Sequence, residues 1–272
     1  MSTDQEWERW GAEDPYFGVL TNPMFRRTAL TPETREEFFR SGQNHVSQML
    51  ETCRLRIDPA FAPHRVLDFG CGVGRLLIGF AKAAQQVVGV DVSVSMLAEA
   101  QRNCAARGAS NVVLLPSDDT LSAIEGSFDL VHSCIVLQHI EIERGRLLFK
   151  LLVERVQPGG IGALHVTFGL DQHAATFGQP PPATNEVESA PAGPLGQVKS
   201  QLRRAVLEPL GLRRPPPAAE PPVVNPDPEM QMNFYNLSEL MFILQRAGVS
   251  QVHTELTDHG GALGAFLFFR RP

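Results

Sequence analysis

The sequence predicts a single α/β domain built on one doubly wound parallel sheet. Between residues 63 and 169, short apolar runs alternate with segments of helical periodicity, which is typical of consecutive strand–helix–strand units. A single glycine-rich turn follows the first apolar run. In such sheets, ligands bind in the crevice at the carboxyl ends of the strands.

The elements follow in order. A helix is expected from Pro32 to about Leu55, because Thr31 caps it and proline suits the first helical position. A Gln-Pro-Gly-Gly turn at 157–160 is expected to precede the fifth strand, and a helix is expected at 237–248. Strands are expected near 65–69, 87–91, 111–115, 128–133, 162–168, 251–256 and 265–269, and further helices near 75–84, 94–107 and 142–156.

The first strand runs into the glycine-rich turn at residues 70–74. Gly70, Gly72 and Gly74 let the backbone turn sharply and approach a nucleotide-like ligand, and the next helix start offers unpaired N–H groups. Asp68 lies two residues before the first glycine, and Arg75 occupies the sixth position, where the dinucleotide pattern has glycine. We expect Gly70 and Gly72 to tolerate no side chain.

Asp91 ends the second strand. A carboxylate there can accept hydrogen bonds from both ribose hydroxyls of an adenosine. The alternative is that Asp91 caps the next helix, a role that Ser93 could equally supply.

Two further segments complete the pattern. The third strand ends in Pro116-Ser117-Asp118-Asp119, and the fourth lies in the run from Ser127 to Ile140. Together, the four segments between about 65 and 140 resemble the class I methyltransferases that use S-adenosylmethionine (SAM). The fourth segment resembles that of a small-molecule group that includes the ubiquinone and menaquinone biosynthesis enzymes.

The resemblance implies a Rossmann-like domain whose last two strands form an antiparallel hairpin, and it implies SAM as the cofactor. An acidic residue after the third strand would bind the adenine amino group. Asp118 is favoured for this role, although Asp119 also fits. The implied cofactor-binding residues are Asp68, Gly70, Gly72, Gly74, Asp91, Val92, Met96, Asp118, Asp119 and Ser133.

Outside this core the sequence predicts three regions. Residues 1–62 form a helical cap before the SAM-binding core at 63–169, and 232–272 add a helix and hairpin that complete that core. Trp7 and Trp10 either close over the SAM site, as in relatives, or pad the side of the sheet. Residues 170–231 are rich in proline, which predicts a substrate lid or insert.

The insert contains one periodic apolar face with basic residues around it. This segment either is a solvated lid helix or recognises an anionic group on the acceptor. The apolar positions are Val198, Leu202, Val206 and Leu210, and the basic ones are Lys199, Arg203, Arg204, Arg213 and Arg214.

Composition excludes several classes of protein. The formal charge of −6 gives no basic surface for nucleic acid. No metal-ligand spacing, no secretory signal and no apolar run of transmembrane length occurs. Four scattered cysteines indicate reduced thiols, so we expect a soluble, cytoplasmic protein. The sequence leaves the oligomeric state open.

Methyl transfer from SAM is an in-line displacement that mainly requires alignment of the acceptor. A hydroxyl or acidic C–H acceptor would also benefit from a general base, for which histidine is suited at neutral pH. The candidates are His139, His165 and His259, with His132 as a further histidine near a strand end. The alternative for each is structural. His139 is interpreted first as a residue at a helix start, His165 could simply be buried, and His259 could serve only the turn at 257–261.

The sequence therefore predicts a SAM-dependent methyltransferase in small-molecule biosynthesis, with O-methylation slightly favoured over C- or N-methylation. Two alternatives remain at this stage. The acceptor could be a protein or glycan, or the protein could be a non-catalytic SAM-binding regulator.

Overall fold

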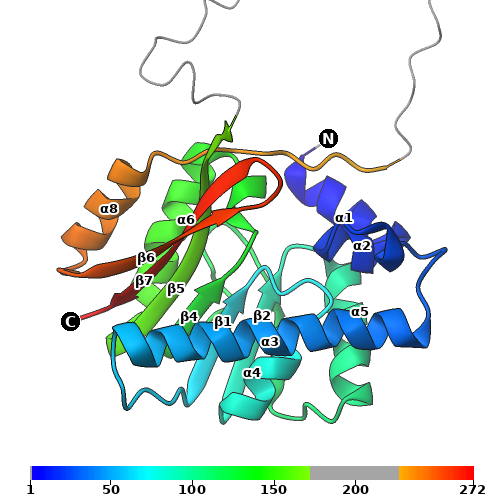
Figure 1. Cartoon of the computed structure of the whole chain (residues 1–272), viewed down its shortest axis with the longest axis horizontal. Helices are drawn as coiled ribbons and strands as arrows, with labels where there is room; N and C mark the ends of the chain where they lie inside the picture. Colours follow the sequence, from blue (N-terminus) through cyan, green and yellow to red (C-terminus); the bar gives the residue numbers. More distant parts are fainter. Residues whose placement is uncertain (1, 172–226) are drawn as a thin grey trace, which may run out of the picture. The chain divides into compact units, whose positions relative to one another are not determined.

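The computed structural model describes residues 2–171 and 227–272, and within them a seven-stranded sheet has the order β3-β2-β1-β4-β5-β7-β6 (Figure 1). The first five strands are parallel, and β7 lies antiparallel between β5 and β6. This confirms the predicted fold class. The strands are β1 (Arg65–Phe69), β2 (Gln86–Asp91), β3 (Val112–Pro116), β4 (Phe128–Ser133), β5 (Val156–Leu170), β6 (Val252–Asp258) and β7 (Ala262–Arg270).

The central strands are apolar because both of their faces are covered. All of β1 except its first residue is buried, as is the middle of β2. The strand order reverses between β1 and β4, so the sheet has a switch point there, and ligands of such sheets bind beside it.

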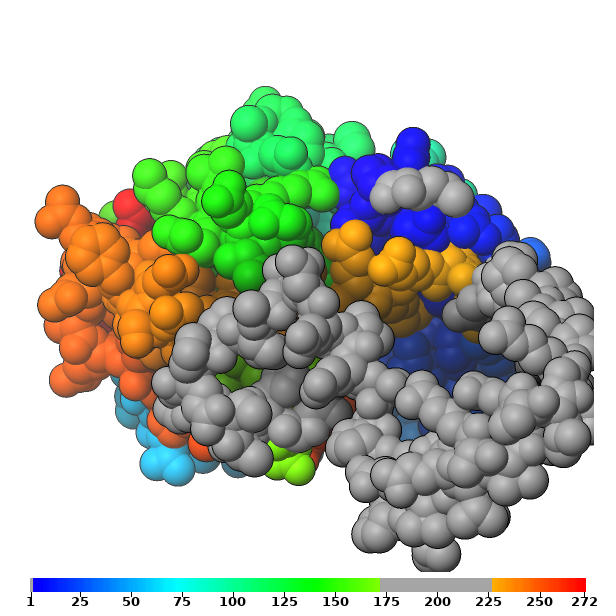
Figure 2. Space-filling view, turned by 90° about the horizontal axis from the view of Figure 1, so that it is seen from above, coloured from blue at the N-terminus to red at the C-terminus, as the bar shows by residue number. Residues whose placement is uncertain are grey.

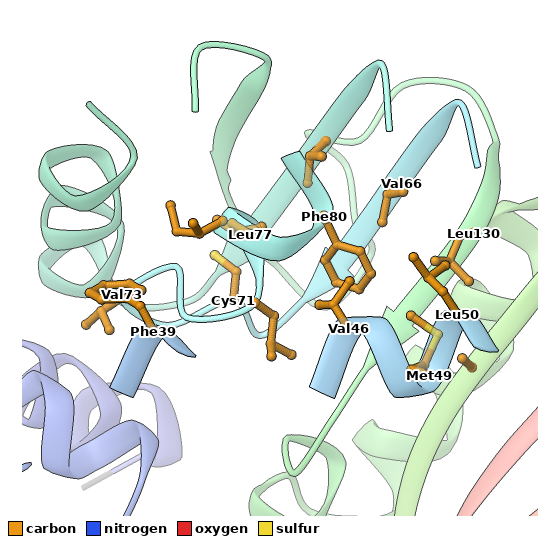
Figure 3. Close-up of a cluster of buried hydrophobic side chains, with 14 of the residues drawn as sticks. Phe39, Val46, Met49, Leu50, Val66, Cys71, Val73, Leu77, Phe80 and Leu130 are labelled. Carbon is orange, nitrogen blue, oxygen red and sulfur yellow. The ribbon is translucent and has the colours of Figure 1, made fainter. Parts of the chain in front are cut away.

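Helices cover both faces of the sheet. The long helix α3 (Pro32–Arg56) begins at its Thr31 cap and packs against α4, where Val46 lies beside Phe80 (Figure 3). A second buried cluster includes side chains of α6 and α8 packed against the strands. The other helices of the core are α4 (Leu77–Ala83), α5 (Val94–Ala106), η2 (Leu137–His139), α6 (Ile142–Arg155) and α8 (Leu237–Arg246).

The N-terminus and a late segment lie above the carboxyl ends of the parallel strands. The N-terminal helices are α1 (Thr3–Glu13) and α2 (Pro15–Val19), followed by η1 (Pro23–Phe25). Residues 227–236 cross above the strand ends toward α8 (Figure 1). Seen from above, this gold segment lies between the dark-blue N-terminal helices and the green part of the chain (Figure 2).

Residues 157–160 differ from the expectation of a turn before the fifth strand. They lie inside β5 as a bulge, since Phe128 pairs with Val156 and Leu130 with Ile161. The backbone of this bulge is satisfied by the chain after β7, because Gly159 N donates to Arg271 O and Arg271 N donates to Gly160 O. The strand therefore continues where proline and glycine predicted an interruption.

Most of the proline-rich insert, residues 172–226, lies outside the described residues, including the apolar face at 198–210 and its basic neighbours. The expectations of a lid and of anion recognition there stay predictions. Across residues 2–171 and 227–272, none of the helices combines the length and the apolar character needed to cross a bilayer.

Candidate active site

A cavity of about 420 Å³ lies at the carboxyl ends of the parallel strands. Its strand side comes from the loops after β1, β2 and β3, and its roof side comes from α1, η2 and the segment 227–236. The strand side includes Asp68, Gly70, Gly72, Asp91, Val92, Met96 and Asp118. The roof side includes Thr3, Asp4, Trp7, Gln138, His139, Met230 and Met232.

The glycine-rich turn needs glycine for its backbone and for its neighbours. Gly70, Gly72 and Gly74 all have positive φ, a region that side chains disfavour. A Cβ on Gly70 would overlap the side chain of Val136, and one on Gly72 would lie 2.6 Å from Val19 Cγ2. Packing within the protein thus restricts both positions, in addition to any ligand. Gly74 shapes the turn but does not line the cavity.

Asp68 lines the cavity and has one carboxylate oxygen without a partner among the described residues. Its side chain is only 2 % exposed, and Oδ1 accepts a hydrogen bond from His132 Nδ1 at 2.8 Å. Oδ2 has no partner among the described residues. Arg75 lines the same cavity, and its Nε likewise lacks a partner in the described part of the chain. Burial lowers the pKa of this guanidinium. The strand side thus carries an unsatisfied acceptor and an unsatisfied donor.

The carboxylate of Asp91 joins the glycine turn to the start of α5. Oδ2 accepts from Gly72 N at 2.8 Å and Oδ1 from Ser93 N at 2.9 Å. Ser93 is the residue that caps α5, because its hydroxyl accepts from Met96 N. Burial raises the pKa of Asp91 to about 6. Ser93, and not Asp91, is therefore the N-cap of α5.

Three of the other expected cofactor residues have local partners. Asp118 accepts hydrogen bonds from Thr120 and Ser122. The bond from the Ser122 hydroxyl stabilises the ionised carboxylate and so lowers the pKa of Asp118. Asp119 does not line the cavity, because it pairs with Arg144 Nε at 2.5 Å. Ser133 is fully buried and donates to Phe69 O at 3.1 Å, so the structure does not bring it to the cavity either.

Polar contacts fix the roof side. Arg144 Nη1 and Nη2 bind the two carboxylate oxygens of Asp4 at 2.7 and 2.9 Å. Thr3 Oγ1 donates to Gln231 Oε1 at 3.0 Å, which joins α1 to the segment 227–236. These bonds hold Trp7, from α1, at the cavity wall and in edge contact with the His139 ring.

His139 is held in one orientation within the roof side. Its Nδ1 lies 2.7 Å from Gln231 O, so Nδ1 must carry the proton. Thr167 Oγ1 donates to Gln138 Oε1, which turns the Gln138 amide nitrogen toward His139 Nε2 at 3.3 Å. Burial lowers the pKa of His139. The ring is therefore neutral at neutral pH, with an unprotonated Nε2.

The other two candidate bases lie differently. His259 lines the cavity on an exposed turn, where Asp258 Oδ1 accepts from Gly261 N and so belongs to the turn. His165 is 1 % exposed, does not line the cavity, and bonds Thr257 Oγ1 at 2.8 Å. Burial lowers the pKa of His165 to about 3. Only His139 and His259 of the three thus reach the cavity.

Several lining residues escaped the sequence analysis. Gln138 lies in the fourth resembling segment but was given no role, and Met230 and Met232 lie in segments without a recognisable motif, Met230 within the predicted insert. Arg75 was noted only as a departure from the dinucleotide pattern. A charged residue directly after a glycine turn, at a position that the fold buries, was the signal available for Arg75.

Comparison with known proteins finds a methyltransferase match in part of the chain. Residues 66–160 match a family described as a methyltransferase domain. This part of the chain is therefore similar to methyltransferase domains. A probable fatty acid methyltransferase of Mycobacterium tuberculosis is 25 % identical over 162 residues, which are 60 % of this chain and 37 % of that protein. A ubiquinone biosynthesis O-methyltransferase of Methylococcus capsulatus is 28 % identical over 35 % of this chain and 41 % of its own length.

Only part of each relative's length is shared with this chain. The matches to these two relatives span about two fifths of their length. Among solved structures, the magnesium protoporphyrin IX methyltransferase of Synechocystis, crystallised with SAM, superposes with a TM-score of 0.55 at 17 % identity, covering 100 % of this chain and 98 % of that chain. At this identity the likeness shows the fold alone.

Proposed function

We propose that this chain is a SAM-dependent methyltransferase that methylates a small-molecule acceptor, with a hydroxyl as the favoured acceptor group. The observation that carries the proposal is the cavity itself. It combines an adenosine-type strand side with a roof side of mixed polar and apolar residues that contains an unprotonated histidine nitrogen.

The strand side fits SAM. Each oxygen of Asp91 accepts one backbone N–H and keeps a further lone pair for a ribose hydroxyl. The unpaired Oδ2 of Asp68 suits the α-ammonium group of the cofactor, and Arg75 suits its carboxylate. Val92 and Met96 add apolar lining. The adenine role of Asp118 stays a prediction: Oδ1 accepts three hydrogen bonds, whereas Oδ2 accepts one from the Ser122 hydroxyl.

When bound, SAM supplies a methyl group on an electrophilic sulfonium, and the protein has to align the acceptor and remove its proton. His139 is placed for the second task, because the Gln231 carbonyl fixes its tautomer and leaves Nε2 free of a proton. A group with a proton to lose, such as a hydroxyl, makes use of this nitrogen. His259 at the exposed turn is the second candidate base.

The roof side favours a small acceptor over a protein or glycan. Helix α1 is pinned by the Asp4–Arg144 pair, and the segment 227–236 is bound to α1 and to η2. Such a roof limits the space above the strand ends. The presence of intact acidic residues at Asp68 and Asp91 does not favour a non-catalytic regulator, which could lose them freely. The four free thiols, three of them buried, support a reducing compartment such as the cytoplasm.

A fractionated activity assay tests this proposal. Purified protein is incubated with SAM and either the low-molecular-mass fraction or the macromolecular fraction of a cell extract, and release of S-adenosylhomocysteine (SAH) is measured by mass spectrometry. We expect release with the small-molecule fraction. Release with the macromolecular fraction alone would contradict a small acceptor, and binding of SAM without release in either fraction would support the regulator.

A further inference from the structure

A row of three polar side chains crosses the apolar core below the cavity. Asp68 on β1 bonds His132 on β4, and His132 Nε2 lies 3.2 Å from His45 Nε2 on α3. His132 is fully buried, with its ring centroid 5.2 Å from Phe80 and 5.8 Å from Phe266. Polar groups are costly in such surroundings unless they are hydrogen-bonded, and here each ring has a partner.

The positions of the shared protons fix the orientation of the His132 ring. An ionised carboxylate only accepts, so His132 Nδ1 carries the proton shared with Asp68 Oδ1. One proton then lies between the Nε2 atoms of His132 and His45. With both of its nitrogens bonded, the His132 ring cannot rotate without breaking two hydrogen bonds.

The consequence falls on Asp68. Residues 68 and 132 are direct neighbours in the parallel pairing of β1 and β4, where two apolar side chains would satisfy the sheet equally well. The histidine instead occupies Oδ1 and leaves Oδ2, a buried oxygen of this cavity-lining residue, without a partner in the described residues. The row thus leaves Oδ2 as the oxygen with free hydrogen-bonding capacity and holds the carboxylate in place.

We propose that His132, held by His45, is a positioning residue that fixes the Asp68 carboxylate so that Oδ2 receives the α-ammonium group of the cofactor. This inference rests on the proposed function, because it requires SAM or SAH in the cavity. Neither histidine lines the cavity, so both act through Asp68.

Two ligands separate positioning from a purely structural role. Calorimetric titration compares SAH with its desamino analogue, in which hydrogen replaces the α-amino group. The wild-type protein should prefer SAH by about tenfold or more, the range for a hydrogen bond to a charged group. His132→Phe should reduce that preference to below about threefold, because Asp68 loses its anchor. His132→Asn should retain it, since the amide nitrogen can take the place of Nδ1.

A variant on α3, outside the sheet, provides a second test in case His132→Phe does not fold. His45→Leu changes a half-buried position on α3 and should lower the preference for SAH, whereas His45→Gln, which keeps a polar partner for His132, should preserve it. Equal loss of affinity for both ligands in His132→Phe and His45→Leu would mean a structural role and would overturn the inference.

Asp68→Asn distinguishes this inference from the proposed function. It should bind both ligands with similar affinity. If Asp68→Asn loses the preference while His132→Phe and His45→Leu keep it, positioning by the histidines is wrong and the cofactor site stands. If Asp68→Asn itself keeps the wild-type preference, the proposed orientation of the cofactor fails, and the inference fails with it.

Discussion

The two sides of the cavity are built in different ways. The strand side comes from residues close together in sequence, since Asp68 and Asp91 end neighbouring strands and Gly72 N bonds Asp91 directly. The roof side joins residues far apart in sequence, as in the Thr3–Gln231 and Asp4–Arg144 contacts. The strand side thus depends mainly on consecutive strand–helix units, whereas the roof side depends on contacts between distant parts of the chain.

This difference separates two kinds of specificity. A site made by one βαβ unit can remain constant while the segments above it change, which suits a shared cofactor and a variable acceptor. We therefore expect changes on the roof side to alter turnover and acceptor affinity with little effect on SAH binding. Changes on the strand side should alter SAH binding first.

The largest expected effect lies on the roof side. His139→Asn keeps a donor for the Gln231 carbonyl but removes the Nε2 base, so turnover of a hydroxyl acceptor should fall by roughly 10²–10⁴-fold. SAH affinity should stay unchanged. The pH–rate profile of the wild type should show an acid limb below about pH 6.5, because burial lowers the pKa of His139 from the ordinary histidine value.

His259→Ala is the matched comparison for this variant. His259 lines the same cavity from an exposed turn, and its removal should have the smaller effect. If His259→Ala abolishes the acid limb and His139→Asn does not, the roles of the two histidines are reversed.

On the strand side, Gly70→Ala should lower stability by about 2–5 kcal/mol. The positive φ costs about 1–2 kcal/mol for a residue with a side chain, and overlap with Val136 adds about 1–3 kcal/mol. Gly108→Ala is the control, because Gly108 also has positive φ but has nothing within 4 Å of an added Cβ. Denaturant unfolding of both variants isolates the overlap, and equal losses would show that Val136 moves aside freely.

Acid should destabilise the protein through its buried histidines. Burial lowers the pKa of His45 and His165 to about 3, so between about pH 6.5 and 3 the unfolded chain binds more protons and stability falls as pH falls. Asp91 acts in the opposite sense, because its pKa is raised to about 6 and its contribution is lost as pH rises toward that value. Three buried histidines with lowered pKa values, His45, His139 and His165, oppose one aspartate, so the net stability should fall as pH is lowered from about 6 to 4.

Thermal unfolding at stepped pH measures this pH dependence. His165→Phe should flatten it, because the titrating ring is gone. A melting temperature of the wild-type protein that stays constant from pH 7 to 4.5 would contradict the burial of the His45 and His165 rings.

The sequence predicted the elements and the strand side because their signals are local. The glycine turn, Asp68 and Asp91 lie within one βαβ unit, and the Thr31 cap marks the start of α3. The contact of Gln231 with His139 could not be predicted, because it joins segments separated by 92 residues and no periodicity marks residue 231. The bulge at 157–160 was misjudged because Pro-Gly-Gly ordinarily interrupts a strand, and only the pairing with β7 and the chain end explains its continuation.

Titration of SAH into the wild-type protein and two aspartate variants tests most directly whether the cavity is the cofactor site. The wild type should bind one SAH per chain with a Kd of about 1 μM, or about 8 kcal/mol. Asp91→Ala should weaken binding by about 1.5–3 kcal/mol, because the ribose hydroxyls lose a charged acceptor. Asp119→Ala removes the same charge outside the cavity and should leave the affinity unchanged. Equal affinities for SAH in the wild type and Asp91→Ala would contradict the assignment of this cavity to the cofactor.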